Sequence, residues 1–93
     1  MKIDHIPDAL TLPLRLKLLC GLAAGKKSFA ELKEITGATD GNLSIQLSKL
    51  EEWRYISSGK TYHGKRPKST YEITQFGLQQ LTEYVELLES VIR

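Results

Sequence analysis

The chain has 93 residues, of which 41% are hydrophobic and 26% are charged, and its net charge is +2. These values are ordinary for a folded globular domain and argue against disorder, so we expect one domain over residues 1–93. A single cysteine, Cys20, excludes an internal disulfide and a multi-cysteine metal site. No apolar run approaches the roughly 20 residues of a membrane span, and no signal peptide is visible, so we expect a soluble, cytoplasmic protein without membrane contact.

The first long helix is predicted to begin near Thr11–Pro13, because proline is favourable in the first helical turn. Leucines at helical spacing from Leu12 to Leu22 make this helix apolar on more than one face, so it needs cover on more than one side. Gly25 is placed just beyond its end. Cys20 lies inside the apolar run, which favours a small core residue over the alternative of a sensing thiol.

Two shorter helices are predicted next, joined by a short turn. The segment Ser28–Glu31 has the pattern of a capping box at the start of the second helix, and Gly37 is placed to end it. Leu32 and Ile35 are expected to point inward. The third helix is predicted over about residues 40–53. Two short helices joined by a turn of three or four residues that contains glycine are typical of a helix-turn-helix.

The third helix has two chemically different sides. Leu43, Leu47 and Leu50 form an inward stripe, whereas the other side carries small, neutral or basic residues in place of the Glu/Lys pairs of a merely solvated helix. Such side chains can hydrogen-bond to base edges, and Ile45 can contact a thymine methyl group. Gln46 ranks last among the base readers, because it lies nearest the core stripe. The predicted DNA contacts of this helix are Asp40, Gly41, Asn42, Ser44, Ile45, Gln46, Ser48 and Lys49.

Residues 55–73 are predicted to form a β-hairpin, because aromatic and β-branched residues flank a loop that contains Gly64 and Pro67. Residues 53–74 hold five basic residues and one acidic residue, a net charge of +4 that exceeds the +2 of the whole chain. This concentration of charge favours contact with phosphates or the minor groove over a loop that is only solvated. The predicted contacts of this wing are Lys60, His63, Lys65, Arg66 and Lys68.

A last helix is predicted over about residues 75–92. Apolar residues recur along it at spacings of three and four, and a second apolar stripe runs beside the first. Together the stripes span roughly half of the helix circumference, more than a small domain can cover, so we predict pairing with a second copy of the chain. The alternative is that both stripes are buried within one chain. The predicted dimer interface consists of Leu12, Leu81, Tyr84, Val85, Leu87, Leu88, Val91 and Ile92.

Several segments taken together carry a family resemblance. They are Leu14–Leu19, Ser28–Leu32, Thr39–Ser44, Leu50 with Glu51, Tyr55 with Ile56, and Gly64–Thr74. In this combination the chain resembles the small stand-alone winged helix-turn-helix transcriptional regulators related to the MarR and ArsR groups, over about residues 10–92. The resemblance implies a mainly α fold with a small β-hairpin wing and a C-terminal dimerisation helix. It also implies a homodimer that binds a pseudo-palindromic operator in double-stranded DNA, most simply as a repressor.

The chain departs from these regulators at a few positions. Trp53 and Arg54 stand where relatives often have a small residue and glycine, which can alter the turn between helix and strand. With His5 and His63 far apart from Cys20, the ArsR-type metal ligands are absent, and we expect no metal or cofactor.

No catalytic pattern appears, so we do not expect an enzyme. A winged helix that binds proteins and not DNA is the alternative function, and whether a small effector binds is open.

Overall fold

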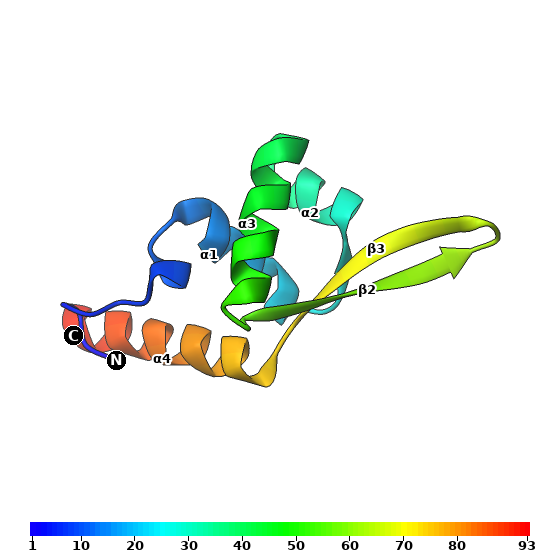
Figure 1. The fold of residues 1–93 in the computed structure, drawn as a ribbon. Helices are drawn as coiled ribbons and strands as arrows, with labels where there is room; N and C mark the ends of the chain where they lie inside the picture. The colour runs from blue at the N-terminus through cyan, green and yellow to red at the C-terminus, as the bar shows by residue number, and fades with distance from the viewer.

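The computed structural model describes the backbone of residues 1–93 and every side chain except that of His63. The elements, in chain order, are the 3-10 helix η1 (Asp8–Leu10), α1 (Pro13–Ala23), β1 (Lys27–Ser28), α2 (Phe29–Thr36), α3 (Asp40–Glu52), β2 (Ile56–His63), β3 (Arg66–Ile73) and α4 (Gln75–Ile92). Helices α1 to α3 cluster together, the β2–β3 hairpin projects away from them, and α4 runs below the cluster (Figure 1). The predicted winged helix-turn-helix fold with a C-terminal helix is therefore confirmed.

The sheet has three antiparallel strands in the order β1-β3-β2. In the hairpin, Ile56 pairs with Ile73 at the base and His63 pairs with Arg66 at the tip, and Gly64 turns the chain there with a φ of 67°. The short strand β1 was not predicted. Because Lys27 and Ser28 pair with β3, β1 ties the start of α2 to the wing.

The core lies between the three clustered helices and the base of the hairpin. Its fully buried side chains are Leu10, Leu18, Leu19, Leu22, Leu32, Leu43, Leu50 and Ile56. Leu81 of α4 joins them with 6% of its surface exposed. The η1 segment, which was not predicted, buries Ala9 and Leu10 and so closes one end of the core.

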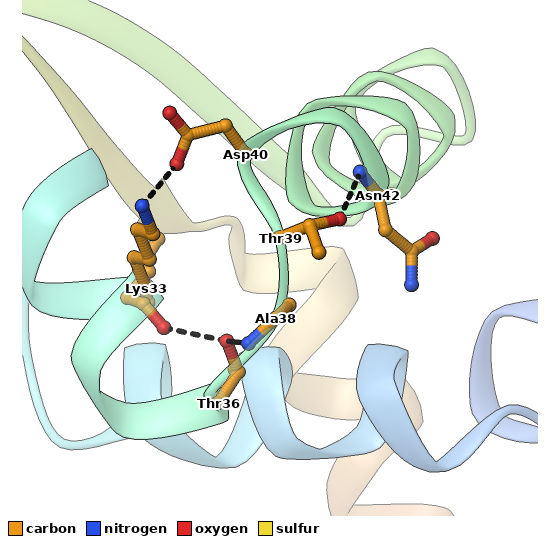
Figure 2. Close-up of polar contacts among 7 residues, drawn as sticks. Lys33, Thr36, Ala38, Thr39, Asp40 and Asn42 are labelled. Carbon is orange, nitrogen blue, oxygen red and sulfur yellow. Dashed lines mark hydrogen bonds and ion pairs between the residues drawn. The ribbon is translucent and has the colours of Figure 1, made fainter.

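Local signals place the helix-turn-helix accurately. Ser28 and Glu31 form the predicted capping box, with the Glu31 N–H donating to Ser28 Oγ at 3.1 Å and the Ser28 N–H donating to Glu31 Oε1 at 2.9 Å. Gly37 ends α2 in the left-handed conformation. Thr39 Oγ1 then accepts from the Asn42 N–H at 3.2 Å and starts α3, as Figure 2 shows. The turn between α2 and α3 is therefore fixed at both ends by hydrogen bonds.

Two side chains expected in the core are not there. Cys20 is exposed, because the inner face of α1 is formed by Leu18, Leu19 and Leu22, and position 20 lies on the opposite side of the helix. Ile35 is 49% exposed, because the short α2 buries only Leu32 fully and leaves Ile35 at the edge of the contact with α1. Both predictions of burial were wrong.

Candidate nucleic-acid interface

The outer side of α3 is the candidate surface for reading a DNA groove. Seven of the eight residues predicted to contact DNA from this helix are exposed: Asp40, Gly41, Asn42, Ser44, Ile45, Ser48 and Lys49. Ile45 has 55% of its surface exposed, although α3 buries its three leucines, Leu43, Leu47 and Leu50. The exposed side therefore combines one apolar contact with small and polar groups.

Gln46 is the eighth residue, and its prediction as a surface base reader is wrong. Its side chain is only 8% exposed, and its Oε1 accepts a hydrogen bond from Arg15 Nε at 2.8 Å. The amide nitrogen of Gln46 donates to Asn42 Oδ1 at 3.4 Å. Gln46 lies beside the leucine stripe of α3 and faces α1, so it supports the exposed side without being part of it. Sequence reasoning did not single out Arg15.

Asp40 begins α3 with a carboxylate, which the positive end of the helix dipole favours. Lys33 of α2 pairs with it across the turn, with Nζ 2.6 Å from Oδ1 (Figure 2). Both side chains are largely solvated, so the pair contributes little to stability. The pair matters more for the charge of the candidate surface, because Lys33 offsets the negative charge of Asp40, which would otherwise repel phosphates. The sequence offered no signal for this pairing.

The hairpin presents basic side chains without acidic partners. Lys60, Lys65, Arg66 and Lys68 are all exposed, and among the described side chains none of the four forms a salt bridge. The predicted contact from His63 lies outside the described side chains. Tyr62 is 68% exposed beside these basic residues. It was not among the predicted contacts, although its place next to the charged hairpin tip is a signal that the sequence contains. The wing therefore carries net positive charge on its surface, although Lys68 is near enough to the Glu31 carboxylate to help lower its pKa.

A shallow polar pocket separates α3 from the base of the hairpin. It is lined by Ser44, Leu47, Ser48, Glu51, Ser58 and Tyr71. The hydroxyl of Ser58 lies 2.5 and 2.9 Å from the two carboxylate oxygens of Glu51, to which it donates. Burial, and secondarily the Glu51 carboxylate, raise the pKa of Tyr71. The charge-assisted bond from Ser58 links the base of the hairpin to α3.

Helix α4 has one apolar face that the chain covers only in part. Leu81 packs into the core, so the prediction that it contributes to a dimer surface is wrong for this residue. Tyr84 and Leu87 are half-buried. The remaining residues of the predicted interface are exposed, by fractions of 36% to 82%: Leu12, Val85, Leu88, Val91 and Ile92. The second half of α4 therefore extends past the core with its apolar side uncovered.

The described part of the chain holds neither a metal-binding cluster nor a membrane-spanning helix. No group of three or more His, Cys, Asp or Glu residues is placed there to hold a metal ion. No described helix is long and apolar enough to cross a membrane.

Comparison with known proteins places the chain in a family. A family model described as "Winged helix DNA-binding domain" matches residues 14–92, and the chain belongs to this family. Among curated protein sequences, none matches significantly.

Three solved structures illustrate the similarity. A transcriptional regulator homologue from Pyrococcus horikoshii OT3 is 28% identical, with a TM-score of 0.82 over 89% of this chain and 83% of that one. The transcriptional repressor BigR from Xylella fastidiosa is 26% identical, with a TM-score of 0.69 over 91% and 80%. A MarR-family regulator from Enterococcus faecalis V583, at 20% identity, shares the fold with a TM-score of 0.82 over 94% and 79%. Fold, family and neighbours define a DNA-binding protein of the transcriptional-regulator class.

Proposed function

We propose that this protein is a sequence-specific regulator of transcription that acts as a homodimer on a pseudo-palindromic operator, where it represses. The observation that carries the proposal is the joined pair of surfaces on α3 and the hairpin. The α3 surface offers hydrogen-bonding groups and one acidic residue, Asp40, which pairs with Lys33. The hairpin offers four exposed cations that form no salt bridge among the described side chains, and the Glu51–Ser58 bond connects the two surfaces.

In this proposal α3 enters the major groove. Asn42 and Ser44 would contact base edges, and Ile45 would pack against a thymine methyl group, since each is exposed on the outer side of α3. Lys49 and the wing cations Lys60, Lys65, Arg66 and Lys68 would contact phosphates. Phosphate contacts fix the register of the protein on DNA, whereas the base contacts give sequence preference.

The uncovered apolar half of α4 supports the homodimer. Val85, Leu88 and Ile92 lie on one side of the helix and would pack against the same residues of a second copy. A two-fold axis would place two recognition helices about 34 Å apart, the spacing of one turn of B-DNA. An operator with inverted half-sites follows from this symmetry.

Repression is proposed because a small DNA-binding dimer can block transcription by occupying a promoter, and because BigR, a repressor, has a similar structure. In vitro transcription from a promoter that overlaps the selected operator tests this directly. Addition of the protein should lower transcript yield. Increased yield would show activation and would contradict repression without affecting the proposed DNA binding.

The primary test is selection of binding sites from a random-sequence duplex library, followed by affinity measurements at increasing salt. A palindromic motif is expected, and Arg66→Gln should lower the slope of log affinity against log salt by about two units, because the dimer loses about one phosphate contact from each copy. The control is Lys17→Gln, which removes an exposed charge from α1, away from the wing. If no motif is enriched and salt has no effect, DNA binding is contradicted, and a protein-interaction module becomes the better interpretation.

A further inference from the structure

A chain of three side chains connects α1 to the exposed side of α3. Arg15 Nε donates to Gln46 Oε1 at 2.8 Å, and Gln46 Nε2 donates to Asn42 Oδ1 at 3.4 Å. Gln46 is 8% exposed and lies between the other two, whereas Asn42 is on the outer surface. Through the buried Gln46, Arg15 of α1 therefore limits the hydrogen bonds that Asn42 can make, and Asn42 is proposed to contact a base.

The direction of this chain is set by chemistry. A guanidinium group has donors and no acceptor, so Gln46 must turn its carbonyl oxygen towards Arg15. The amide nitrogen of Gln46 then faces Asn42 and can only donate. Asn42 must accept through its own oxygen, and its NH2 group is left for other partners. The orientation of both amides thus follows from Arg15 and does not depend on how oxygen and nitrogen are assigned in either side chain.

Arg15 is itself held in place by two further contacts. Its Nη1 donates to the backbone carbonyl of Asp8 at 2.8 Å, which uses the η1 segment as a support. Its guanidinium carbon lies 5.0 Å from the centre of the Trp53 ring, within the range of a cation–π interaction. Trp53 follows α3 directly, so the guanidinium contacts the recognition helix at its middle, through Gln46, and just beyond its C-terminal end. A side chain fixed in this way orients its partner before any ligand arrives.

We propose that Arg15 is a positioning residue that sets the base preference of this protein by making Asn42 present its NH2 group, a hydrogen-bond donor, to the major groove. The inference rests on the proposed function, because it assumes that Asn42 faces a base. An unconstrained asparagine can offer both its oxygen and its nitrogen to adenine. Here the bond from Gln46 turns the oxygen towards the scaffold and the NH2 group outward, so Asn42 favours a base edge that accepts, such as O6 or N7 of guanine or O4 of thymine, over the amino group of cytosine.

The variant Gln46→Glu tests the proposal by changing polarity with little change in shape. The new carboxylate still pairs with Arg15, but it cannot donate to Asn42. The Asn42 amide is then expected to turn, donate to the carboxylate and present its oxygen to the groove. Binding-site selection with this variant should shift preference at one operator position, by about ten-fold, from an accepting edge to an amino group of cytosine or adenine. Selection with Asn42→Ala identifies which position that is.

Variants of Arg15 provide the second arm. Arg15→Met removes the donor and should reduce discrimination at the Asn42 position by about ten-fold, with the other positions unchanged. Arg15→Lys should retain much of the discrimination, because an ammonium group also only donates. The matched control is Lys17→Met, which removes an exposed cation from the same helix and should leave the motif unaltered. Thermal melting shows whether each variant is folded.

A measurement without DNA tests the hydrogen bonds on which this inference rests, and binding-site selection separates the inference from the proposed function. In the free protein, hydrogen exchange of the Gln46 side-chain amide, followed by NMR, should be slowed and should become faster in Arg15→Met. If the wild-type protein selects a motif but the Arg15 and Gln46 variants select the same one, the positioning role is overturned and the proposed function stands. If the wild-type protein selects no motif, the proposed function falls and the positioning role falls with it, whatever the exchange rates show.

Discussion

A single arginine occupies a backbone position that normally favours glycine. Arg54, between α3 and β2, has a φ of 65°, and the turn forms nevertheless: its N–H donates to the Glu51 carbonyl at 3.0 Å and its carbonyl accepts from Thr74 Oγ1 at 2.7 Å. Left-handed backbone costs an L-residue about 1 to 2 kcal/mol. Arg54 therefore strains the turn without preventing its hydrogen bonds.

Arg54→Gly should stabilise the protein. Relief of the left-handed strain outweighs the greater freedom of glycine in the unfolded chain, so the free energy of unfolding should rise by up to about 1 kcal/mol. Urea denaturation followed by circular dichroism measures this change. Arg54→Ala is the matched control, since it removes the same charge and keeps a Cβ. Equal effects of the two substitutions would show that charge, and not backbone strain, is responsible.

Gly77 is required for close packing at the start of α4. A Cβ atom at this position would lie 2.2 Å from the carbonyl oxygen of Tyr55 and 3.1 Å from Ile73 Cγ1. The Tyr55 carbonyl also accepts from the Thr74 N–H, so the backbone there has little freedom to move. Gly77→Ala should lower the free energy of unfolding by on the order of 3 kcal/mol, despite the better helix propensity of alanine.

Thermal or urea unfolding of Gly77→Ala tests this expectation. Gly41→Ala is its control, because Gly41 is also helical and a Cβ there meets no atom within 4 Å. That variant should be neutral or stabilised by up to about 1 kcal/mol. Similar losses in both variants would mean that the contact with Tyr55 is not the cause.

At the scale of elements, the sequence predicted those features that depend on neighbouring residues. The capping box at Ser28, the glycine end at Gly37 and the span 75–92 of the last helix all depend on local hydrogen bonds and periodicity, and the structure has each of them. Strand β1 exists only because β3 pairs with it, and no local pattern marks two residues as a strand. Its detection requires knowledge of the tertiary arrangement.

The side chains that were predicted wrongly are likewise those whose positions depend on long-range contacts or on packing that no local pattern shows. Helical periodicity gives the faces of α3, but the burial of Gln46 depends on Arg15, 31 positions away in the sequence. Cys20 lies in a run that is apolar on more than one face, so periodicity alone did not show which side faces the core. The outer side of α3 and the wing were predictable because their signals are exposed chemistry and charge. The supporting contact from Arg15 is a long-range one and was not.

The start of α2 should show a specific dependence on pH. The Ser28 N–H, which donates to the Glu31 carboxylate, lowers the pKa of Glu31 below its ordinary value of 4.5. Because the pKa of Glu31 is lower in the folded state than in the unfolded chain, the ionised carboxylate stabilises the fold fully above pH 4.5. This stabilisation is lost as the pH falls through the lower pKa of the folded state. Unfolding curves between about pH 6 and about pH 3 should show this loss.

The variant Glu31→Gln isolates this contribution. It retains a side chain that can accept from the Ser28 N–H but cannot titrate, so its stability should fall less steeply below pH 4.5 than that of the wild-type protein. Identical pH profiles for the two proteins would rule out the capping box as a source of acid sensitivity.

At the scale of the whole molecule, α4 links the domain to a surface that the domain does not cover. The first half of the helix buries Leu81 in the core, whereas Val85, Leu88 and Ile92 are exposed beyond it by 39% to 82%. The molecule is elongated, with extents of 51 × 25 × 22 Å, and the second half of α4 and the hairpin lie at opposite ends (Figure 1). Self-association through α4 would therefore leave the wing free.

Val85→Glu is the variant that tests the proposed dimer. A carboxylate at an exposed position costs the isolated chain little, but in a two-fold interface it would be buried near its symmetry mate. Sedimentation should then give a monomer where the wild-type protein gives a dimer. Affinity for a two-half-site operator should fall on the order of 100-fold, because the second half-site no longer binds intramolecularly, while affinity for a single half-site should be unchanged.

Gln79→Glu, on the opposite side of α4, is the control and should remain dimeric. A wild-type protein that sediments as a monomer would contradict the interface, and a dimeric Val85→Glu would place it elsewhere on the molecule.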